Sequence, residues 1–226
     1  MRNNRVRLAI KALVAYIVGI VVLGALFFLP AGSLYYEGGW RMLALLFTPM
    51  FLMGVVLLIA SPDLLARRLS SKEKRAKQSG VIRFSGLIFL TGFVLAGLDW
   101  RLNWSNPSNT ATTIASIIFL VGYLLYFEVM RENVWLSRTI EVNEGQKVIS
   151  SGLYGIVRHP MYTSTLLMFL AMPVVLGSWW AVIPFVFYIP VIIIRILDEE
   201  KCLCQELDGY KDYCSRIRWR LFPFVW

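Results

Sequence analysis

The sequence has a single histidine, His159, and only three cysteines, Cys202, Cys204 and Cys214. Metal sites built from these residue types need several ligands at fixed spacings, and Cys202-x-Cys204 has neither a ligand spacing nor a second pair. The sequence therefore predicts no metal ion, and we expect the thiols to stay free. It also lacks a Gly-x-Gly-x-x-Gly fingerprint, which argues against a soluble Rossmann domain.

Polar residues are scarce as well: 58% of the 226 residues are hydrophobic, and the mean hydropathy is +0.62. Soluble domains are typically about 45–50% apolar, so this composition indicates a membrane protein. Apolar stretches cover residues 12–29, 42–60, 84–98, 112–127, 161–176 and 179–194. We predict an all-α integral membrane protein with six transmembrane helices, or five if the last pair does not cross fully. A two-residue break, Gly177-Ser178, makes that last pair a helical hairpin.

Positive charge is nearly absent from one side of these stretches. Only Arg41 and Arg101, of the 23 lysines and arginines, fall on that side. The other 21 lie before the first stretch, in loops 61–83 and 131–158, and from Arg195 onward. This asymmetry predicts that both termini are cytoplasmic. The net charge of +9 then reflects topology and attraction to anionic lipid headgroups, and we expect no nucleic-acid partner.

Two functional parts can be distinguished. Residues 1–130 are a predicted four-span scaffold. Residues 131–226 contain a polar loop, the hairpin and an amphipathic tail with a break near Gly209. Within the loop, residues 139–149 alternate apolar and polar side chains, which favours a short hairpin or an extended segment on the cytoplasmic face.

Charged residues gather at the mouth of the predicted helical hairpin. Arg158-His159-Pro160-Met161-Tyr162 enters its first arm, and Arg195 with Glu199-Glu200 leaves its second. A hairpin brings both groups to one membrane face, where charged side chains are costly and a ligand site is the default hypothesis. Arg195 and Glu199 share a helix face, either as an ordinary ion pair or as a clamp for a ligand with both charges.

The order of these motifs resembles the integral-membrane isoprenylcysteine carboxyl methyltransferase family and its bacterial relatives. The resemblance is carried by Arg158-His159-Pro160-x-Tyr162, the long apolar hairpin and Arg195-x-x-x-Glu199-Glu200. It extends from Gly145-x-x-Val148-x-x-Gly152-x-Tyr154 to Gly209-Tyr210-x-x-Tyr213, and Ser164 departs from a glycine that is common in the family. The first four apolar stretches match only in being apolar.

This resemblance implies an S-adenosylmethionine (S-adenosyl-L-methionine)-dependent methyltransferase that is a multi-pass membrane protein, with its active site on the cytoplasmic face of a bacterial inner membrane. Arg195 corresponds to the position that faces the methyl acceptor, as a catalytic and substrate-binding residue. The implied cofactor-binding residues are Gln146, Lys147, Val148, Ile149, Tyr154, His159, Pro160, Met161, Tyr162 and Glu199.

Methyl transfer from a sulfonium needs alignment and exclusion of water more than acid–base catalysis. A carboxylate acceptor is already ionised at neutral pH, which agrees with a site that has one histidine. We therefore expect O-methylation of a carboxylate on a lipidic or membrane-embedded acceptor that enters between the spans. The alternatives are a phospholipid-amine N-methyltransferase, an NADPH-dependent membrane reductase similar to sterol reductases, and a non-catalytic lipid-binding protein.

Overall fold

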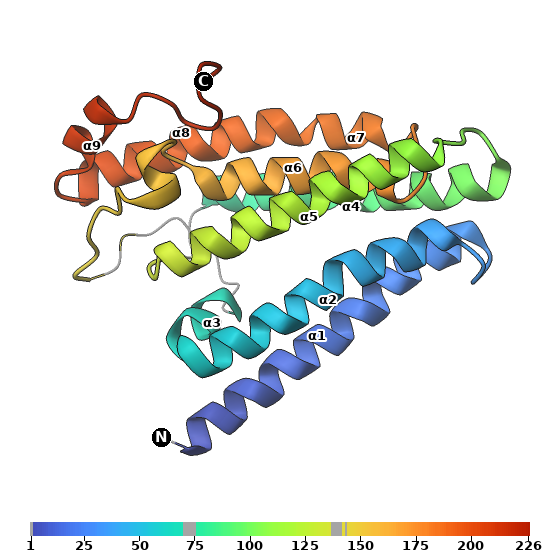
Figure 1. Cartoon of the computed structure of the whole chain (residues 1–226), viewed down its shortest axis with the longest axis horizontal. Coiled ribbons are helices and arrows are strands. Elements are labelled where there is room, and N and C mark those ends of the chain that lie inside the picture. The colour runs from blue at the N-terminus through green and yellow to red at the C-terminus, as the bar shows by residue number, and fades with distance from the viewer. Residues whose placement is uncertain (1, 70–75, 137–141, 143) are drawn as a thin grey trace.

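The structure, a computed structural model, describes residues 2–69, 76–136, 142 and 144–226, and every regular element in these ranges is helical (Figure 1). The prediction of an all-α protein is confirmed for this part of the chain. The predicted extended segment at 139–149 lies partly outside the described residues, and residues 142 and 144–149 contain no strand. The elements are α1 (Arg2–Ala31), α2 (Glu37–Ala60), α3 (Pro62–Leu69), α4 (Ala76–Leu102), α5 (Asn109–Glu132), the 3-10 helix η1 (Gly152–Gly155), α6 (Pro160–Val175), α7 (Val182–Val186), α8 (Tyr188–Glu206) and α9 (Tyr210–Arg216).

Within the described ranges, four helices are long and apolar enough to cross a membrane, namely 5–31, 37–60, 80–102 and 109–132. The chain is thus a multi-pass membrane protein. Helix α6 is apolar but has 16 residues, which at 1.5 Å each span about 24 Å of a hydrocarbon core of about 30 Å.

The sixth apolar stretch is divided between α7 and α8, so the described residues do not show six complete spans. The division has a sequence cause. Pro190 lies in the first turn of α8 and cannot donate the backbone hydrogen bond that would reach back to Val186. Whether α6 and the α7–α8 arm cross the membrane fully stays a prediction.

The helical hairpin itself is confirmed, since α7 and α8 fold back along α6 (Figure 1). Gly177 turns the chain with a φ of +84°, a conformation that favours glycine. Ser178 is fully buried and donates a short hydrogen bond to Asp99 near the end of α4. Asp99 is also fully buried and accepts from the Ser105 backbone at 2.6 Å. The turn of the hairpin is therefore fixed to the end of α4.

Close backbone contacts hold the scaffold against the hairpin. The Tyr36 hydroxyl donates to the Leu176 carbonyl at 2.6 Å. A Cβ on Gly38 would lie 2.1 Å from the same carbonyl oxygen, so only glycine fits there. Between α5 and α6, a Cβ on Gly122 would lie 3.0 Å from the Ser164 carbonyl oxygen. Ser164 is the position where the resemblance to the methyltransferases departs, and the structure places it in this tight helix contact.

The chain turns again after α8. Gly209 has a φ of +77° and precedes α9, which confirms the predicted break. Residues 217–226, here called the return segment, then run back to the start of α6. The end of α5, α3 and α9 lie at the same end of the bundle (Figure 1), the end predicted to be cytoplasmic.

Candidate functional site

A pocket lies at this end of the bundle, between the start of α6, the second half of α8, residues 133–136 and residues 146–154. Its volume is about 860 Å³, including the space at its opening to solvent. The lining residues are Asn133, Trp135, Leu136, Gln146, Lys147, Val148, Ile149, Tyr154, Arg158, His159, Met161, Tyr162, Arg195, Glu199, Leu203, Leu207, Tyr210 and Tyr213.

Nearly all the site residues expected from the sequence line this one pocket. The loop residues 146–149, Tyr154, the start of α6 and both charged residues of α8 meet there. Pro160 is the exception, because it is buried at the first position of α6 without lining the pocket. That position suits proline, whose missing N–H would have no helical partner. The cofactor-binding and catalytic roles of all these residues stay predictions.

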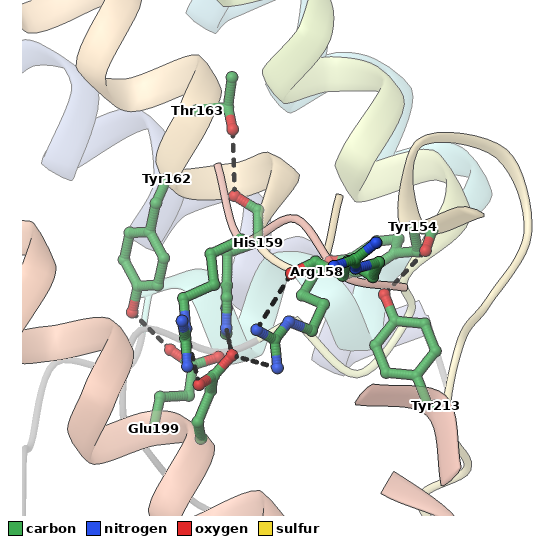
Figure 2. Close-up of polar contacts among 10 residues, drawn as sticks. Tyr154, Arg158, His159, Tyr162, Thr163, Glu199 and Tyr213 are labelled. Carbon is green, nitrogen blue, oxygen red and sulfur yellow. Dashed lines mark hydrogen bonds and ion pairs between the residues drawn. The ribbon is translucent and has the colours of Figure 1, made fainter. Parts of the chain in front are cut away.

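Arg195 and Glu199 are joined through a third side chain. The Tyr162 hydroxyl donates to Glu199 Oε2 at 2.5 Å (Figure 2), and Arg195 Nε donates to the Tyr162 hydroxyl at 3.0 Å. Tyr162 is 3% exposed, so this chain of hydrogen bonds crosses from α8 to α6 and back inside the protein. It positions a guanidinium and a carboxylate on one wall of the pocket.

Glu200, beside the predicted ligand residue Glu199, is a site residue whose role the sequence did not specify. Its Oε1 lies 3.0 Å from Arg158 Nη1 and 3.3 Å from His159 Nε2, and Arg220 Nε donates to Oε2 at 2.9 Å. Burial alone would raise the pKa of Glu200, but the hydrogen bond and charge of His159, with those of the two arginines, lower it below the usual 4.5. The Glu200 carboxylate therefore fixes the His159 ring and the Arg158 side chain beside the pocket. Figure 2 labels these two partners.

The return segment supports the same residues through the backbone. Arg158 N–H donates to the Trp219 carbonyl at 2.8 Å, and His159 N–H donates to the Arg220 carbonyl at 2.9 Å. Thr163 Oγ1 donates to the Leu221 carbonyl at 2.7 Å. The two backbone bonds occupy N–H groups just before α6, which have no partner within the helix. The arginine-rich composition of this segment was visible in the sequence, but no pattern indicated that it pairs with residues 158–163.

Tyr154 is held from three directions. Asn133 Nδ2 donates to its hydroxyl at 2.9 Å, and the Tyr213 hydroxyl donates to its backbone carbonyl at 2.7 Å. Glu132 accepts from the neighbouring Leu153 N–H at 3.0 Å. Gly152 lies so close that a Cβ there would be 1.4 Å from a Glu132 carboxylate oxygen. Burial, the largest influence, raises the pKa of the Tyr154 hydroxyl, so it stays a neutral hydrogen-bonding group.

Tyr210 is a pocket residue with an unsatisfied polar atom. Its hydroxyl is buried and has no hydrogen-bond partner among the described residues. Buried polar groups are nearly always paired, and a ligand bound in the pocket would supply the missing partner. With Glu199, Arg195 and the backbone of residues 146–149, the pocket wall suits a polar ligand that carries both charges.

A second, larger cavity adjoins the pocket. It encloses about 1,970 Å³ including its opening, and it shares Met161, Tyr162 and Arg195 with the pocket. From these residues it reaches Met168 and Tyr188, about two helical turns further into the bundle. Its walls are largely apolar and come from α2, α3, α4, α5, α6 and α8. The described lining residues are Met50, Met53, Gly54, Leu57, Leu65, Arg68, Leu69, Val81, Ile82, Ser85, Tyr123, Tyr126, Met130, Met161, Tyr162, Thr165, Met168, Phe169, Tyr188, Val191 and Arg195.

The family model for phospholipid methyltransferases matches residues 110–207 of this chain. This range includes nearly all of α5, the hairpin, the pocket loop, His159 and Glu199. It supports a membrane domain of the methyltransferase type in the part of the chain that carries the site.

The chain is also similar to curated sterol reductases. It is 32% identical over 91 residues to a Delta(14)-sterol reductase of Mus musculus, which covers 39% of this chain and 22% of that protein. It is 25% identical over 167 residues to the Delta(14)-sterol reductase of Arabidopsis thaliana, which covers 67% of this chain and 44% of that protein. The chain thus spans less than half the length of these relatives. The similarity to a methyltransferase-type membrane domain is supported, whereas the isoprenylcysteine carboxyl methyltransferase family specifically stays a prediction.

Proposed function

We propose that the protein is an integral-membrane methyltransferase that uses S-adenosylmethionine and methylates a carboxylate on a lipidic or membrane-embedded acceptor. The observation that carries this proposal is the shared wall between a polar pocket and an apolar cavity. Tyr162 and Arg195 line both spaces. A water-soluble donor and a lipidic acceptor can therefore meet there while entering from different sides.

The residues of the polar pocket fit the methyl donor. Glu199 offers a carboxylate for an ammonium or ribose hydroxyl group, and Tyr210 offers an unpaired hydroxyl. Tyr154 and Trp135 offer aromatic rings for a base. The loop 146–149 offers backbone groups. When bound, S-adenosylmethionine supplies an electrophilic methyl group on a sulfonium.

The chain's own residues then have three tasks. Glu200 and the return segment hold His159 and Arg158 in place. Tyr162 keeps Glu199 and Arg195 aligned. Arg195 binds the acceptor carboxylate through charge-assisted hydrogen bonds and orients one oxygen for displacement. No general base is needed, because the carboxylate is already ionised, and the largely apolar cavity excludes water from the reacting atoms.

Donor binding is tested with the full chain purified into lipid nanodiscs. We expect saturable binding of S-adenosylmethionine and its demethylated product by calorimetry, and no comparable binding of NADPH. Glu199→Gln and His159→Ala should each weaken binding by about 1–3 kcal/mol, the typical effect of losing a charged or buried hydrogen-bond partner. Glu206→Gln, at an exposed acid on the same helix, is the matched control and should bind normally. Absence of saturable donor binding to the wild-type protein would refute the proposal.

The chemistry of the acceptor needs a separate measurement. Membranes containing the protein are incubated with methyl-labelled donor, and the extracted lipids are treated with mild base. Release of label indicates an ester and supports carboxylate methylation. Base-stable label on a phospholipid amine would favour N-methylation, the candidate that the matching phospholipid methyltransferase model supports.

A reductase is a second candidate because of the similarity to Delta(14)-sterol reductases. It predicts the opposite cofactor preference in the same calorimetric experiment, with tight binding of NADPH. A non-catalytic lipid-binding protein predicts binding of neither cofactor. The three functions therefore give three distinct results.

A further inference from the structure

Helix α3 contributes Leu65, Arg68 and Leu69 to the wall of the second cavity, at the end predicted to be cytoplasmic. Leu64 and Leu65 are 1% and 7% exposed and pack in the same buried cluster as Tyr154. Arg67 donates a short hydrogen bond to the Val134 carbonyl, next to the residues that line the polar pocket. These contacts fix the orientation of α3, so the side chain that follows Arg67 has a defined place.

That side chain, Arg68, lines the apolar cavity. Its guanidinium lies over the ring of Tyr126 at 5.4 Å from the centroid, and Tyr126 lines the cavity as well. A cation–π contact of this kind holds the guanidinium against the cavity wall. Charged groups that border an apolar membrane cavity are costly, so a ligand site is the default hypothesis for them.

Arg68 and Arg195 both line the cavity, and no acidic side chain is among its described lining residues. Glu199, which is joined to Arg195 through Tyr162, lines the polar pocket instead. The cavity wall therefore favours a ligand with negative charge. Arg195 is on the wall shared with the polar pocket, whereas Arg68 lies on α3, which packs against α1 and α2. One anionic group of an acceptor can therefore bind at each place.

We propose that Arg68 is a specificity-determining residue that binds a second oxyanion of the acceptor, a phosphate or a carboxylate. The guanidinium fork matches both groups in a bidentate manner. The acceptor is then an anionic amphiphile whose chain occupies the apolar part of the cavity, near Met168 and Phe169. This inference rests on the proposed function only in taking the cavity as the acceptor site.

The test uses three single-chain probes with a photoreactive diazirine, namely an alkyl phosphate, a fatty acid and a fatty alcohol. The full chain is cross-linked in nanodiscs of zwitterionic phosphatidylcholine, and labelled residues are mapped by mass spectrometry. We expect at least one anionic probe to label cavity residues such as Tyr126 and Met168. Arg68→Gln should lower that labelling roughly tenfold, by loss of charge-assisted hydrogen bonds. The comparison of phosphate with fatty acid identifies which oxyanion is preferred.

Two controls separate recognition from folding. Labelling by the fatty alcohol should be unchanged in Arg68→Gln, and Arg83→Gln, at an exposed arginine that does not line the cavity, should leave all probes unchanged. Arg68→Lys should keep part of the preference for the anionic probe. The inference is overturned if Arg68→Gln leaves anionic labelling unchanged or lowers labelling by all probes equally. No methyl donor is present in this experiment, so its result is independent of whether the protein binds S-adenosylmethionine.

Discussion

Replacing Glu200 by glutamine removes one buried negative charge that lies between two arginines and the His159 ring. Glu200 is 8% exposed, and the Arg158 side chain facing it is 9% exposed. Removing one partner of such a buried pair typically costs about 3–5 kcal/mol, because the other charge is left uncompensated. Arg220, the third partner, has a side chain that is 28% exposed, and glutamine keeps one acceptor oxygen. We therefore expect Glu200→Gln to lower the free energy of unfolding by about 2–3 kcal/mol.

Glu200→Gln should also weaken binding of the methyl donor in the pocket. Without the carboxylate, the His159 ring and the Arg158 side chain lose the contact that fixes them. We expect donor affinity to fall roughly tenfold, the effect of about 1.4 kcal/mol. Unfolding is followed by circular dichroism in mixed micelles with increasing denaturing detergent, and binding is followed by calorimetry with the demethylated donor.

Glu206→Gln supplies the matched control, since Glu206 is an exposed acid on the same helix. Surface substitutions typically change stability by less than about 0.5 kcal/mol. If Glu200→Gln unfolds and binds like the wild-type protein, the view that this carboxylate organises the start of α6 is refuted.

The same geometry predicts the outcome of three other perturbations. Because the pKa of Glu200 is lowered in the folded protein, its carboxylate stabilises the folded state at pH values above the ordinary pKa of 4.5. This stabilisation is lost as the pH falls through the lower folded-state pKa. Unfolding midpoints measured against pH should show the loss, and Glu200→Gln should flatten the curve. Gly38→Ala forces a methyl group to within 2.1 Å of the Leu176 carbonyl oxygen and should destabilise the fold by about 2 kcal/mol, whereas Gly24→Ala, which meets nothing within 4 Å, should be neutral or stabilising; equal effects in detergent unfolding would contradict the close contact. Tyr213→Phe removes the hydroxyl that bonds the carbonyl of Tyr154 in η1 at 2.7 Å and should cost about 1 kcal/mol of stability and weaken donor binding; unchanged calorimetric affinity would show that η1 is positioned by other contacts.

The membrane helices could be predicted because their signal is local. The apolar stretches are continuous, and Gly177-Ser178 marks the turn of the hairpin. The division of the sixth stretch was less evident, although Pro190 carried a signal for it. A proline can be accommodated in a membrane helix or can end it, and the neighbouring helices decide between these outcomes.

The pocket was predictable as a set of residues, but the role of each residue was not. Glu199 and Glu200 are adjacent on α8, so their side chains point about 100° apart. The family resemblance assigned Glu199 to the site, whereas the contacts of Glu200 came only from the structure. The pairing of Arg158 and His159 with the return segment joins residues that are distant in the chain. Such contacts depend on how the helices pack and leave no periodic pattern behind.

The wall of Tyr162 and Arg195 between the two cavities has a kinetic consequence for the proposed enzyme. In that enzyme the nucleoside would occupy the polar pocket and the amphiphile the apolar cavity, so each ligand has a site of its own. Either substrate can then bind first, and each product can dissociate from its own site. Initial rates measured while both concentrations are varied should then follow a random-order, sequential rate law.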